Sequence, residues 1–339
     1  MTKPTIALVL GDPSGIGPEV AVKVLAQEAN RLQANILIIA DEYELRKGMD
    51  IAQTSFEYDV VEQFEQANFS AGKPVLLKFK SSHPDAIQYG SATPQGGTYV
   101  LESLKIAVDL TLAHKTHGIC FAPLNKQAMS KAGLQHRDEL SWFAELTGFD
   151  GFGCEVNVVD DIWAGRVTSH IPFKHVVDNL SVDSVLETIE LMDSTLKSAG
   201  FEQPRIAVQA LNPHGGEGGL FGDEEITIIT PAIEKAQQKG IQAFGPFPGD
   251  TTMWVVEKEA MNSIVSMYHD QGATALKMMG FDRGVTVQGG IPIPIATANH
   301  GSAFDIYGKN IASTPAMENA LKLTVRMASS YQNKHTQQG

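Results

Sequence analysis

The sequence predicts an α/β fold in which a parallel or mixed β-sheet is covered by helices. Its apolar runs are short and continuous, as in residues 6–10 (Ile-Ala-Leu-Val-Leu), which is typical of strands buried on both faces. Helix-length stretches separate these runs, and this alternation indicates parallel or mixed strands. The composition, with 43% hydrophobic and 19% charged residues, is that of a globular protein with a substantial core.

The elements can be placed in order along the chain. The strand at 6–10 ends in the glycine-rich segment 11–19, where Pro18 suits the first turn of a helix. Further strands are expected at 35–40, 118–122, 156–159, 205–211 and 263–268, and helices at 96–114, 182–198, 224–239 and 315–329. The polar end, residues 331–339, is expected to be frayed.

Length and charge limit the classes of function. A chain of 339 residues is long enough for two domains, or for one large body with a cleft. The net charge of -13 argues against nucleic acid or an anionic membrane surface as the main partner. An anionic substrate stays possible, because local cations or a metal ion can override the overall charge.

Cysteine usage and the first residues predict a cytoplasmic protein. Cys120 and Cys154 are the two cysteines, and they form no Cys-x-x-Cys motif, which favours a reducing compartment. The first residues lack the pattern of a signal peptide, and no apolar run reaches the length of a membrane span.

Three histidines each follow a predicted strand: His170, His214 and His269. Ligands of α/β proteins gather where strands end at their carboxyl edge, and three imidazoles with an open fourth position suit a divalent metal that acts as a Lewis acid. Each histidine alone could be structural, and the glycine-rich loop around His214 could be a plain surface turn. The wide spacing means that tertiary or quaternary structure would have to assemble the site.

A thirteen-residue segment, 300–312, has the composition of a cofactor loop. Its small residues and single carboxylate would let an adenine and its ribose approach the backbone closely, although an ordinary glycine-rich turn is the alternative. The chain has no Walker loop, nucleophile elbow or G-x-G-x-x-G fingerprint. The segment resembles the adenosine-binding loop of the isocitrate/isopropylmalate dehydrogenase superfamily, which implies a nicotinamide cofactor.

The chain as a whole resembles the 4-hydroxythreonine-4-phosphate dehydrogenase family of vitamin B6 biosynthesis. The matching segments run in order along the chain: residues 11–19, Pro123 with Lys126, 169–172, 211–219, 249–251, 268–272 and 300–308. The resemblance implies a two-domain α/β subunit of the isopropylmalate-dehydrogenase type, with a cleft between the domains. Residues 1–130 with 275–339 would form the cofactor-side domain, and 131–274 the substrate, metal and dimerisation domain.

The resemblance also implies the roles of individual residues. His170, His214 and His269 would bind zinc, or magnesium, manganese or cobalt, with His170 supplied by the neighbouring subunit of a homodimer. Asp250, Asp270 and Lys277 would be catalytic: the carboxylates orient ligands or carry protons, and the lysine binds substrate. NAD or NADP would be bound by Gly215, Gly216, Glu217, Gly218, His300, Gly301, Ser302, Ala303 and Asp305.

The implied reaction is an oxidative decarboxylation. The metal would hold the substrate hydroxyl and lower its pKa, and the cofactor would take a hydride from the hydroxyl-bearing carbon. The resulting β-keto acid would then lose carbon dioxide.

Four positions differ from the family's substrate-binding residues. Glu139 and Leu140 occupy the positions of a His-Thr pair, Thr286 that of an asparagine, and Ile295 that of a phosphate-binding arginine. Each charge-assisted bond lost with such an arginine is worth about 1.5–3 kcal/mol. These differences lead us to expect a non-phosphorylated substrate, such as the aromatic cis-dihydrodiol carboxylates of the terephthalate dihydrodiol dehydrogenase branch.

Two alternatives remain open. The first is 4-hydroxythreonine-4-phosphate dehydrogenase activity in pyridoxal phosphate biosynthesis, or oxidation of a phosphorylated four-carbon sugar acid, with His136 or Arg283 recognising the phosphate. The second is a binding protein that has lost turnover. The intact histidines and aspartates argue against this second alternative, because a binder has no need of a metal centre for hydride transfer.

Overall fold

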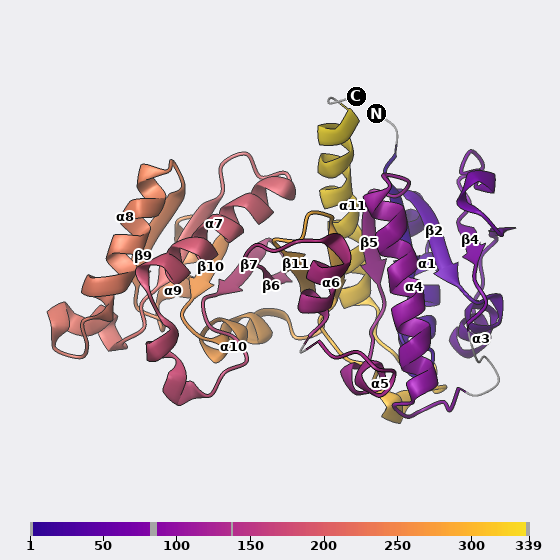
Figure 1. The fold of residues 1–339 in the computed structure, drawn as a ribbon, viewed down its shortest axis with the longest axis horizontal. Coiled ribbons are helices and arrows are strands. Elements are labelled where there is room, and N and C mark those ends of the chain that lie inside the picture. The colour runs from indigo at the N-terminus through magenta and orange to yellow at the C-terminus, as the bar shows by residue number, and fades with distance from the viewer. Residues whose placement is uncertain (1–2, 82–86, 137, 337–339) are drawn as a thin grey trace. The chain divides into compact units, whose positions relative to one another are not determined.

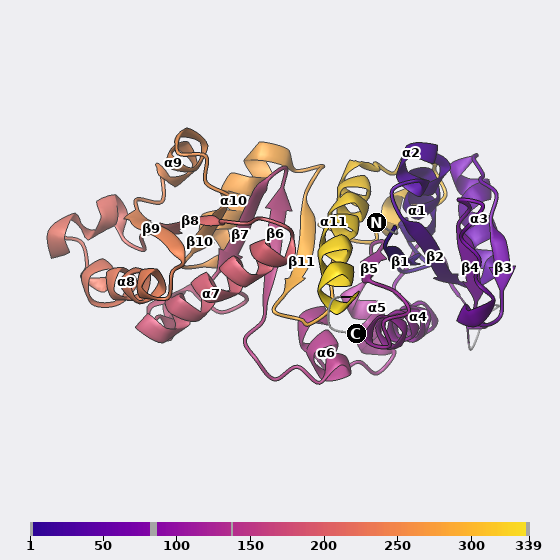
Figure 2. The same cartoon turned by 90° about the horizontal axis from the view of Figure 1, so that it is seen from above.

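The computed structural model describes residues 3–81, 87–136 and 138–336, and the chain divides into two compact units (Figures 1 and 2). Unit 1 comprises Met1–Asp150 and Ile291–Gly339, and unit 2 comprises Gly151–Gly290. The sequence predicts boundaries at residues 130 and 274, and the two compact units divide after residues 150 and 290. The shifts have two causes: the helix Glu139–Thr147 contacts the long helix of unit 1, and the strand Val285–Gly289 pairs within unit 2.

Unit 1 contains parallel strands in the order β3-β4-β2-β1-β5-β12. Their bounds are β1 (Thr5–Val9), β2 (Asn35–Ala40), β3 (Asp59–Val61), β4 (Val75–Lys78), β5 (Gly118–Phe121) and β12 (Ile295–Ala298). Every residue of β1 and β5 is buried, as the continuous apolar runs predict. The α/β fold class is therefore confirmed.

Helices cover this sheet, and short polar side chains cap several of them. The bounds are α1 (Gly17–Ala26), α2 (Glu28–Arg31), α3 (Glu42–Ala52), α4 (Pro94–Leu112), α5 (Lys126–Lys131), α6 (Glu139–Thr147) and α11 (Pro315–Thr336). Thr93 caps α4 by accepting a hydrogen bond from the Gly96 amide at 3.1 Å, and Asp138 caps α6 through the Ser141 amide at 2.9 Å.

The expected fraying of residues 331–336 is wrong, because α11 continues to Thr336. The ring centroids of Tyr331 and His335 lie 5.9 Å and 4.6 Å from that of His114, so the last described turns are packed. Residues 337–339 lie outside the described part of the chain.

Unit 2 contains a mixed sheet in the order β11-β6-β7-β10-β8-β9. The bounds are β6 (Cys154–Val159), β7 (Ile162–Arg166), β8 (Arg205–Gln209), β9 (Gln242–Phe247), β10 (Ser263–Ser266) and β11 (Val285–Gly289). The strands β11, β6 and β7 pair antiparallel, whereas β7, β10, β8 and β9 are parallel. Four parallel strands therefore end at one edge of this sheet.

The helices of unit 2 are α7 (Val182–Ser198), α8 (Thr230–Gln238), α9 (Thr252–Lys258) and α10 (His269–Gly280). The bounds of α7 are those expected from the sequence. The helix expected over 224–239 instead begins with a π-helical turn, Glu225–Ile229, before α8. Among the described helices, none is both long and apolar enough to cross a membrane.

A buried carboxylate, Glu44, lies in unit 1 beside the ring of Tyr89. Its side chain accepts a hydrogen bond from the Tyr89 hydroxyl at 2.9 Å, and the Tyr89 ring stacks on that of Tyr307 with centroids 5.3 Å apart. Burial raises the pKa of Glu44 to about 7, although the Tyr89 hydrogen bond opposes the shift.

This raised pKa predicts a pH-dependent stability. The folded chain holds the Glu44 proton more tightly than the unfolded chain, whose value is near 4.5, so the free energy of unfolding falls as the pH rises from there to about 7. The Glu44→Gln variant, which has no such proton, should show a shallower decline between about pH 5 and pH 8 in urea titrations. The exposed Glu57→Gln is the matched control, and equal slopes for wild type and Glu44→Gln would contradict the assignment.

Candidate active site

The candidate site of unit 2 lies at the carboxyl ends of four neighbouring parallel strands. In the order β7, β10, β8, β9, these strands lead into the loops that carry His170, His269, His214 and Asp250. Ligands of α/β folds gather at this edge. The sheet order therefore brings to one edge the loops of four residues that lie far apart in the sequence.

Backbone contacts join the first two of these loops. The Thr168 amide and hydroxyl both donate to the Met267 carbonyl oxygen, at 3.1 and 2.7 Å. The rings of His170 and His269 then lie with their centroids 5.6 Å apart. Two of the three predicted metal ligands are thus neighbours within a single chain.

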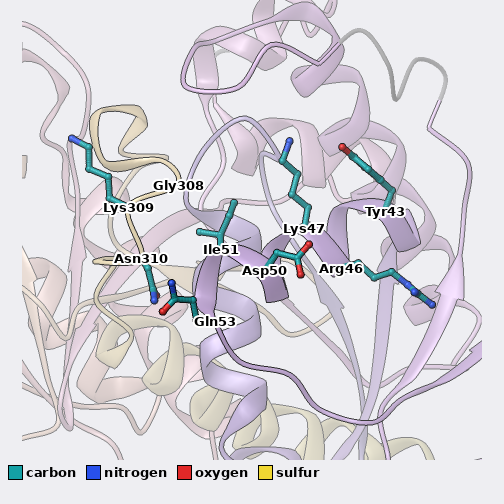
Figure 3. A pocket seen from close by; sticks show the side chains of 9 residues that line it. All are labelled: Tyr43, Arg46, Lys47, Asp50, Ile51, Gln53, Gly308, Lys309 and Asn310. Atoms are coloured by element: carbon teal, nitrogen blue, oxygen red, sulfur yellow. The ribbon is translucent and has the colours of Figure 1, made fainter.

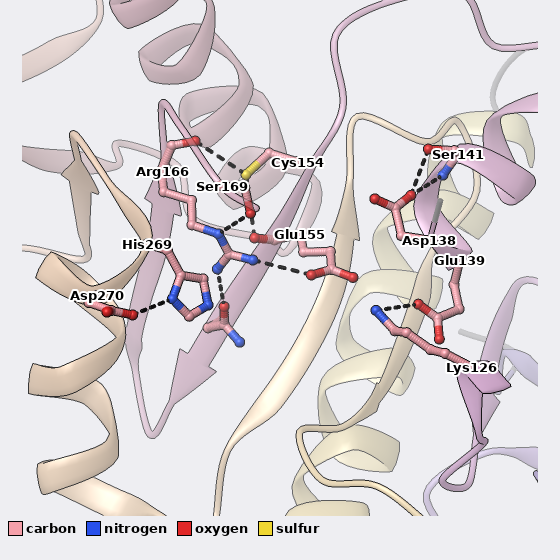
Figure 4. A network of polar contacts seen from close by, with 11 residues as sticks. Lys126, Asp138, Glu139, Ser141, Cys154, Glu155, Arg166, Ser169, His269 and Asp270 are labelled. Atoms are coloured by element: carbon pink, nitrogen blue, oxygen red, sulfur yellow. Dashed lines mark hydrogen bonds and ion pairs between the residues drawn. The ribbon is translucent and has the colours of Figure 1, made fainter. Parts of the chain in front are cut away.

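Arg166, at the end of β7, fixes the residue before His170 (Figure 4). Its Nε donates to the Ser169 hydroxyl at 2.9 Å, Nη1 to Asn157 Oδ1 at 2.6 Å and Nη2 to Glu155 Oε2 at 3.2 Å. The side chain is 7% exposed, so the guanidinium is a buried anchor. Sequence reasoning missed it, although a lone arginine that ends a strand is the signal that could have found it.

A carboxylate orients the imidazole of His269. Its Nδ1 lies 2.7 Å from Asp270 Oδ1, as Figure 4 shows. A histidine whose Nδ1–H is bound to a carboxylate presents the lone pair of Nε2 to a ligand. Asp270 thus lies where it can orient this imidazole, whereas Asp250 and Lys277 are exposed side chains on the Gly249 loop and on α10.

The loop that carries His214, η5 (Pro213–Gly219), has an unusual backbone. Residues 214–218 all have positive φ, between 45° and 78°. Its base is held by Glu225, whose Oε1 accepts the amides of Leu211 and Asn212, both at 2.8 Å. Burial opposes ionisation of Glu225, but these hydrogen bonds outweigh it and lower the pKa of the carboxyl.

The single chain does not assemble the three-histidine site. Over residues 3–81, 87–136 and 138–336, no three or more His, Cys, Asp or Glu side chains are grouped so as to hold a metal. The ring of His214 instead lies 6.4 Å from that of Phe221. The chain brings together His170 and His269 with Asp270, but does not add His214 to them.

Several buried or half-buried polar side chains at this edge were also not identified from the sequence. Ser266 donates to Gln209 Oε1 at 2.7 Å, and Gln271 bridges the Met267 amide (2.8 Å) and the Ala210 carbonyl (2.6 Å). Thr286, a predicted substrate contact, is 8% exposed and pairs with Asn157 across β11 and β6. It is therefore adjacent in register to a partner of Arg166.

The predicted substrate residues of unit 1 are more enclosed. Glu139 Oε2 lies 3.0 Å from Lys126 Nζ, with 7% and 57% of the side chains exposed (Figure 4). Leu140 packs against the core of unit 1, and Ile295 is fully buried in it. A substrate contact by Ile295 is therefore wrong for this structure, because the hydrophobic core encloses its side chain.

The two alternative phosphate ligands already have carboxylate partners. His136 Nε2 lies 2.6 Å from Glu145 Oε2. Arg283 Nη2 lies 3.1 Å from Asp160 Oδ2 and donates to the Met279 carbonyl at 2.9 Å. Each side chain therefore has a structural role within its own unit.

The predicted cofactor residues fall in both units, with Gly215–Gly218 in unit 2 and His300–Asp305 in unit 1. In unit 1, β1, β5 and β12 are neighbours, so the segment 11–19, Pro123 and the His300 loop follow their carboxyl ends. Gly11 needs to be glycine here: its φ is +73°, and a Cβ would lie 2.3 Å from the Pro123 carbonyl oxygen.

The His300 loop is open to solvent at its glycines. A Cβ built on Gly301 or Gly308 would meet nothing within 4 Å, and Asp305 is exposed. Ser302 is buried and Ala303 is half-buried, so these two side chains pack the loop against unit 1.

An open cavity of about 740 Å³ lies between α3 and residues 308–310 (Figure 3). Its cations Arg46, Lys47 and Lys309 point in different directions, and Arg46 is paired with Glu42 at 2.7 Å. These cations therefore do not point to a common position where an anion could bind.

Comparison with known proteins identifies the family. The model of the family described as pyridoxal phosphate biosynthetic protein PdxA matches residues 32–324. A Pasteurella multocida protein, provisionally named 4-hydroxythreonine-4-phosphate dehydrogenase, is 59% identical over 98% of this chain and 100% of its own length. A Salmonella typhimurium D-threonate 4-phosphate dehydrogenase is 35% identical, over 97% of this chain and 100% of its own.

Solved structures agree. The 4-hydroxythreonine-4-phosphate dehydrogenase of Klebsiella pneumoniae matches with a TM-score of 0.85 and 32% identity, over 96% of this chain and 98% of that one. A terephthalate 1,2-cis-dihydrodiol dehydrogenase of Burkholderia xenovorans shares the fold, with a TM-score of 0.68 at 24% identity over 96% and 98% of the two chains. The match over most of its length shows that this chain belongs to the PdxA family.

Proposed function

We propose that this chain is a dehydrogenase that oxidises a hydroxyl of a phosphorylated four-carbon hydroxy acid, of the class of 4-hydroxythreonine 4-phosphate or D-threonate 4-phosphate. Full-length relatives carry the names of these two activities, which favours the phosphorylated alternative over a non-phosphorylated substrate. The observation that carries the site assignment is the pairing of the His170 and His269 rings at the sheet edge, with Asp270 bound to His269.

The donor set fits a divalent metal ion. The resemblance implies that His170 comes from the neighbouring subunit, but its ring lies beside His269 of the same chain. These two imidazoles, one of them oriented by a carboxylate, would be two of the metal ligands, and His214 or a group from a second subunit would complete the site. Such an ion, when bound, lowers the pKa of a substrate hydroxyl and stabilises the charge that develops on it. Imidazole ligands favour zinc and cobalt, whereas magnesium and manganese prefer oxygen ligands such as carboxylates, so the proposal leaves the choice among these four ions open.

The chain's own residues hold the site in place. Arg166 fixes Ser169 and therefore the backbone that carries His170. Asp250 is exposed, so its carboxylate can accept a proton. Lys277 is also exposed, so its ammonium group can pair with a substrate carboxylate or phosphate. The open side of the His300 loop would take the adenosine of NAD or NADP, with Asp305 facing the ribose.

A second substrate class is favoured by one observation. By resemblance, Glu139, whose carboxylate is buried against Lys126, and Ile295, which the core encloses, stand at positions where the family has phosphate ligands. Because neither side chain can bind a phosphate, the substrate of this second class would be a non-phosphorylated hydroxy acid, such as a cis-dihydrodiol carboxylate. Loss of carbon dioxide after oxidation is part of the proposal for either substrate, provided that the carbonyl forms β to a carboxylate.

A homodimer is also part of the proposal. Unit 2 exposes several large apolar side chains, and a second subunit that covered them would remove this apolar surface from water. The exposed fractions are 72% for Phe173, 73% for Leu220, 61% for Trp254, 84% for Met278 and 77% for Phe281.

The metal site can be tested with Asp270→Asn. The amide keeps the shape of the side chain but orients His269 less strongly, so the affinity for manganese or zinc should fall about 10–100-fold. Metal titration by calorimetry measures this directly, and turnover at limiting metal should fall in parallel. His175→Ala, an exposed histidine of the same unit, is the control. Unchanged metal affinity in Asp270→Asn would refute the assignment.

The substrate class can be tested with a panel of acids and the absorbance of the reduced cofactor. 4-Hydroxythreonine 4-phosphate and D-threonate 4-phosphate should be oxidised, whereas D-threonate and a phthalate-type dihydrodiol should react slowly. Glu139→Gln removes a negative charge beside Lys126 and should lower KM for the phosphorylated acids only. Faster oxidation of the unphosphorylated acids would establish the second class instead.

The dimer can be tested by light scattering. Wild-type protein should have twice the mass of one chain, and the double variant Met278→Glu with Phe281→Glu should be monomeric, because two carboxylates are costly to bury in an apolar interface. Leu32→Glu, an exposed apolar position in unit 1, should leave the mass unchanged. A monomeric wild type would rule the dimer out.

A further inference from the structure

We propose that Glu19 and Lys23, both on α1, are positioning residues for the dinucleotide, because together they fix the end of the cofactor loop at Ala312. The inference deepens the proposed function and rests on it for the identity of the ligand.

One ion pair binds both backbone groups of Ala312. Glu19 Oε1 accepts hydrogen bonds from the Ala312 amide at 3.0 Å and from Lys23 Nζ at 2.7 Å. Lys23 Nζ in turn donates to the Ala312 carbonyl at 3.2 Å. The amide and the carbonyl of a single loop residue are therefore bound by two side chains one helical turn apart.

Burial makes these contacts strong. Glu19 is 2% exposed and Ala312 is 6% exposed, so little water competes for either group. Hydrogen bonds to an ionised partner are shorter and stronger than neutral ones, and more so where the dielectric constant is low. An ordinary i,i+4 ion pair on a helix surface contributes little by comparison.

The other end of the loop is held from the same place. The Ile16 amide, at the start of α1, donates to the Ser302 carbonyl at 3.0 Å. Gly15 packs so closely on Ser302 that a Cβ would lie 2.5 Å from this carbonyl oxygen. Residues 302 and 312 are thus both fixed by the segment 15–23, whereas Asp305, Gly308 and Lys309 between them are exposed.

This arrangement orders a loop before its ligand arrives. A loop that is already fixed loses less conformational entropy on binding, so its affinity is higher. Weakening the contacts at Ala312 should therefore weaken dinucleotide binding, while the reacting groups in unit 2 keep their local geometry. The expected signature is an increase of KM for the cofactor with little change of kcat.

The test uses four variants of the full chain. Lys23→Met removes the donor to the Ala312 carbonyl, Glu19→Ala removes the acceptor, and Glu19→Gln restores an oxygen that can accept the Ala312 amide. Asp109→Ala breaks the exposed i,i+4 pair Lys105–Asp109, 2.7 Å long, on α4, and is the matched control. Calorimetric titration with NAD+ and with ADP-ribose gives the affinities, steady-state kinetics gives KM and kcat, and amide hydrogen exchange reports on residues 303–311 without nucleotide.

We expect Lys23→Met and Glu19→Ala to weaken nucleotide binding about 10-fold, the usual scale for a lost charge-assisted bond. Exchange over 303–311 should speed up in both, Glu19→Gln should recover most of the affinity, and Asp109→Ala should match wild type. Lys23 is 19% exposed, so Lys23→Met decides the matter even if Glu19→Ala does not fold.

Two negative outcomes are distinguishable. If wild type binds the nucleotide and a folded Lys23→Met binds it equally well, with unchanged exchange over 303–311, the positioning role is refuted and the proposed function stands. If wild type binds neither NAD+, NADP+ nor ADP-ribose, the proposed cofactor and the positioning role fail together.

Discussion

The register of parallel strands is the constraint on which the candidate site depends. In unit 2, Ser266 of β10 pairs with Arg166 of β7, and Val265 pairs with Val208 of β8, so the three strands end almost level. Their buried apolar side chains fix this register, because a slip of one residue would turn each side chain to the other face. The loops that carry the three histidines begin where these strands end, so core packing is what brings the loops to one edge of the sheet.

Buried polar groups then hold the edge. Gln209 is fully buried and Ser266 is 1% exposed, and the two satisfy each other across β8 and β10. Arg166 does the same between β7 and β6. Since an unpaired buried donor or acceptor is costly, such pairs tolerate few alternative arrangements of the loops. The same logic applies in unit 1, where Glu19 and Lys23 satisfy the backbone of Ala312.

Local pattern was enough for the elements whose periodicity is strong. The bounds of β2 and α7, and the placing of three histidines after strands, follow from apolar runs and caps that act within a few residues. The features that local pattern did not predict depend on residues outside the element in question. The role of Arg166 depends on Asn157 and Glu155, which lie on β6. The last turns of α11 pack against His114. The resemblance places Ile295 at an arginine position, but the core that encloses this side chain is built from strands far away in the sequence.

The His214 loop shows a different limit. Five successive residues with positive φ are unfavourable for His214 and Glu217, which carry a Cβ. Glu225 holds the start of this loop through the Leu211 and Asn212 amides, so the strain is confined to the segment beyond. A loop fixed at its base and exposed at its tip is free to place the His214 imidazole differently when a metal or a second subunit is bound.

In the function we propose, recognition of a phosphorylated substrate would depend on lysines rather than on an arginine. The resemblance places Ile295 at an arginine position, Ile295 is buried, and Arg283 and His136 are paired with carboxylates, so Lys277 or Lys126 would meet the phosphate. A lysine is a compact charge without the planar fork that grips two phosphate oxygens, so recognition through it is less directional. Glu139 lowers the net charge beside Lys126 further. A site built on lysines would bind a phosphorylated acid through overall charge and would tolerate variation in the acid's shape, which is how the proposed substrate class agrees with the altered contacts.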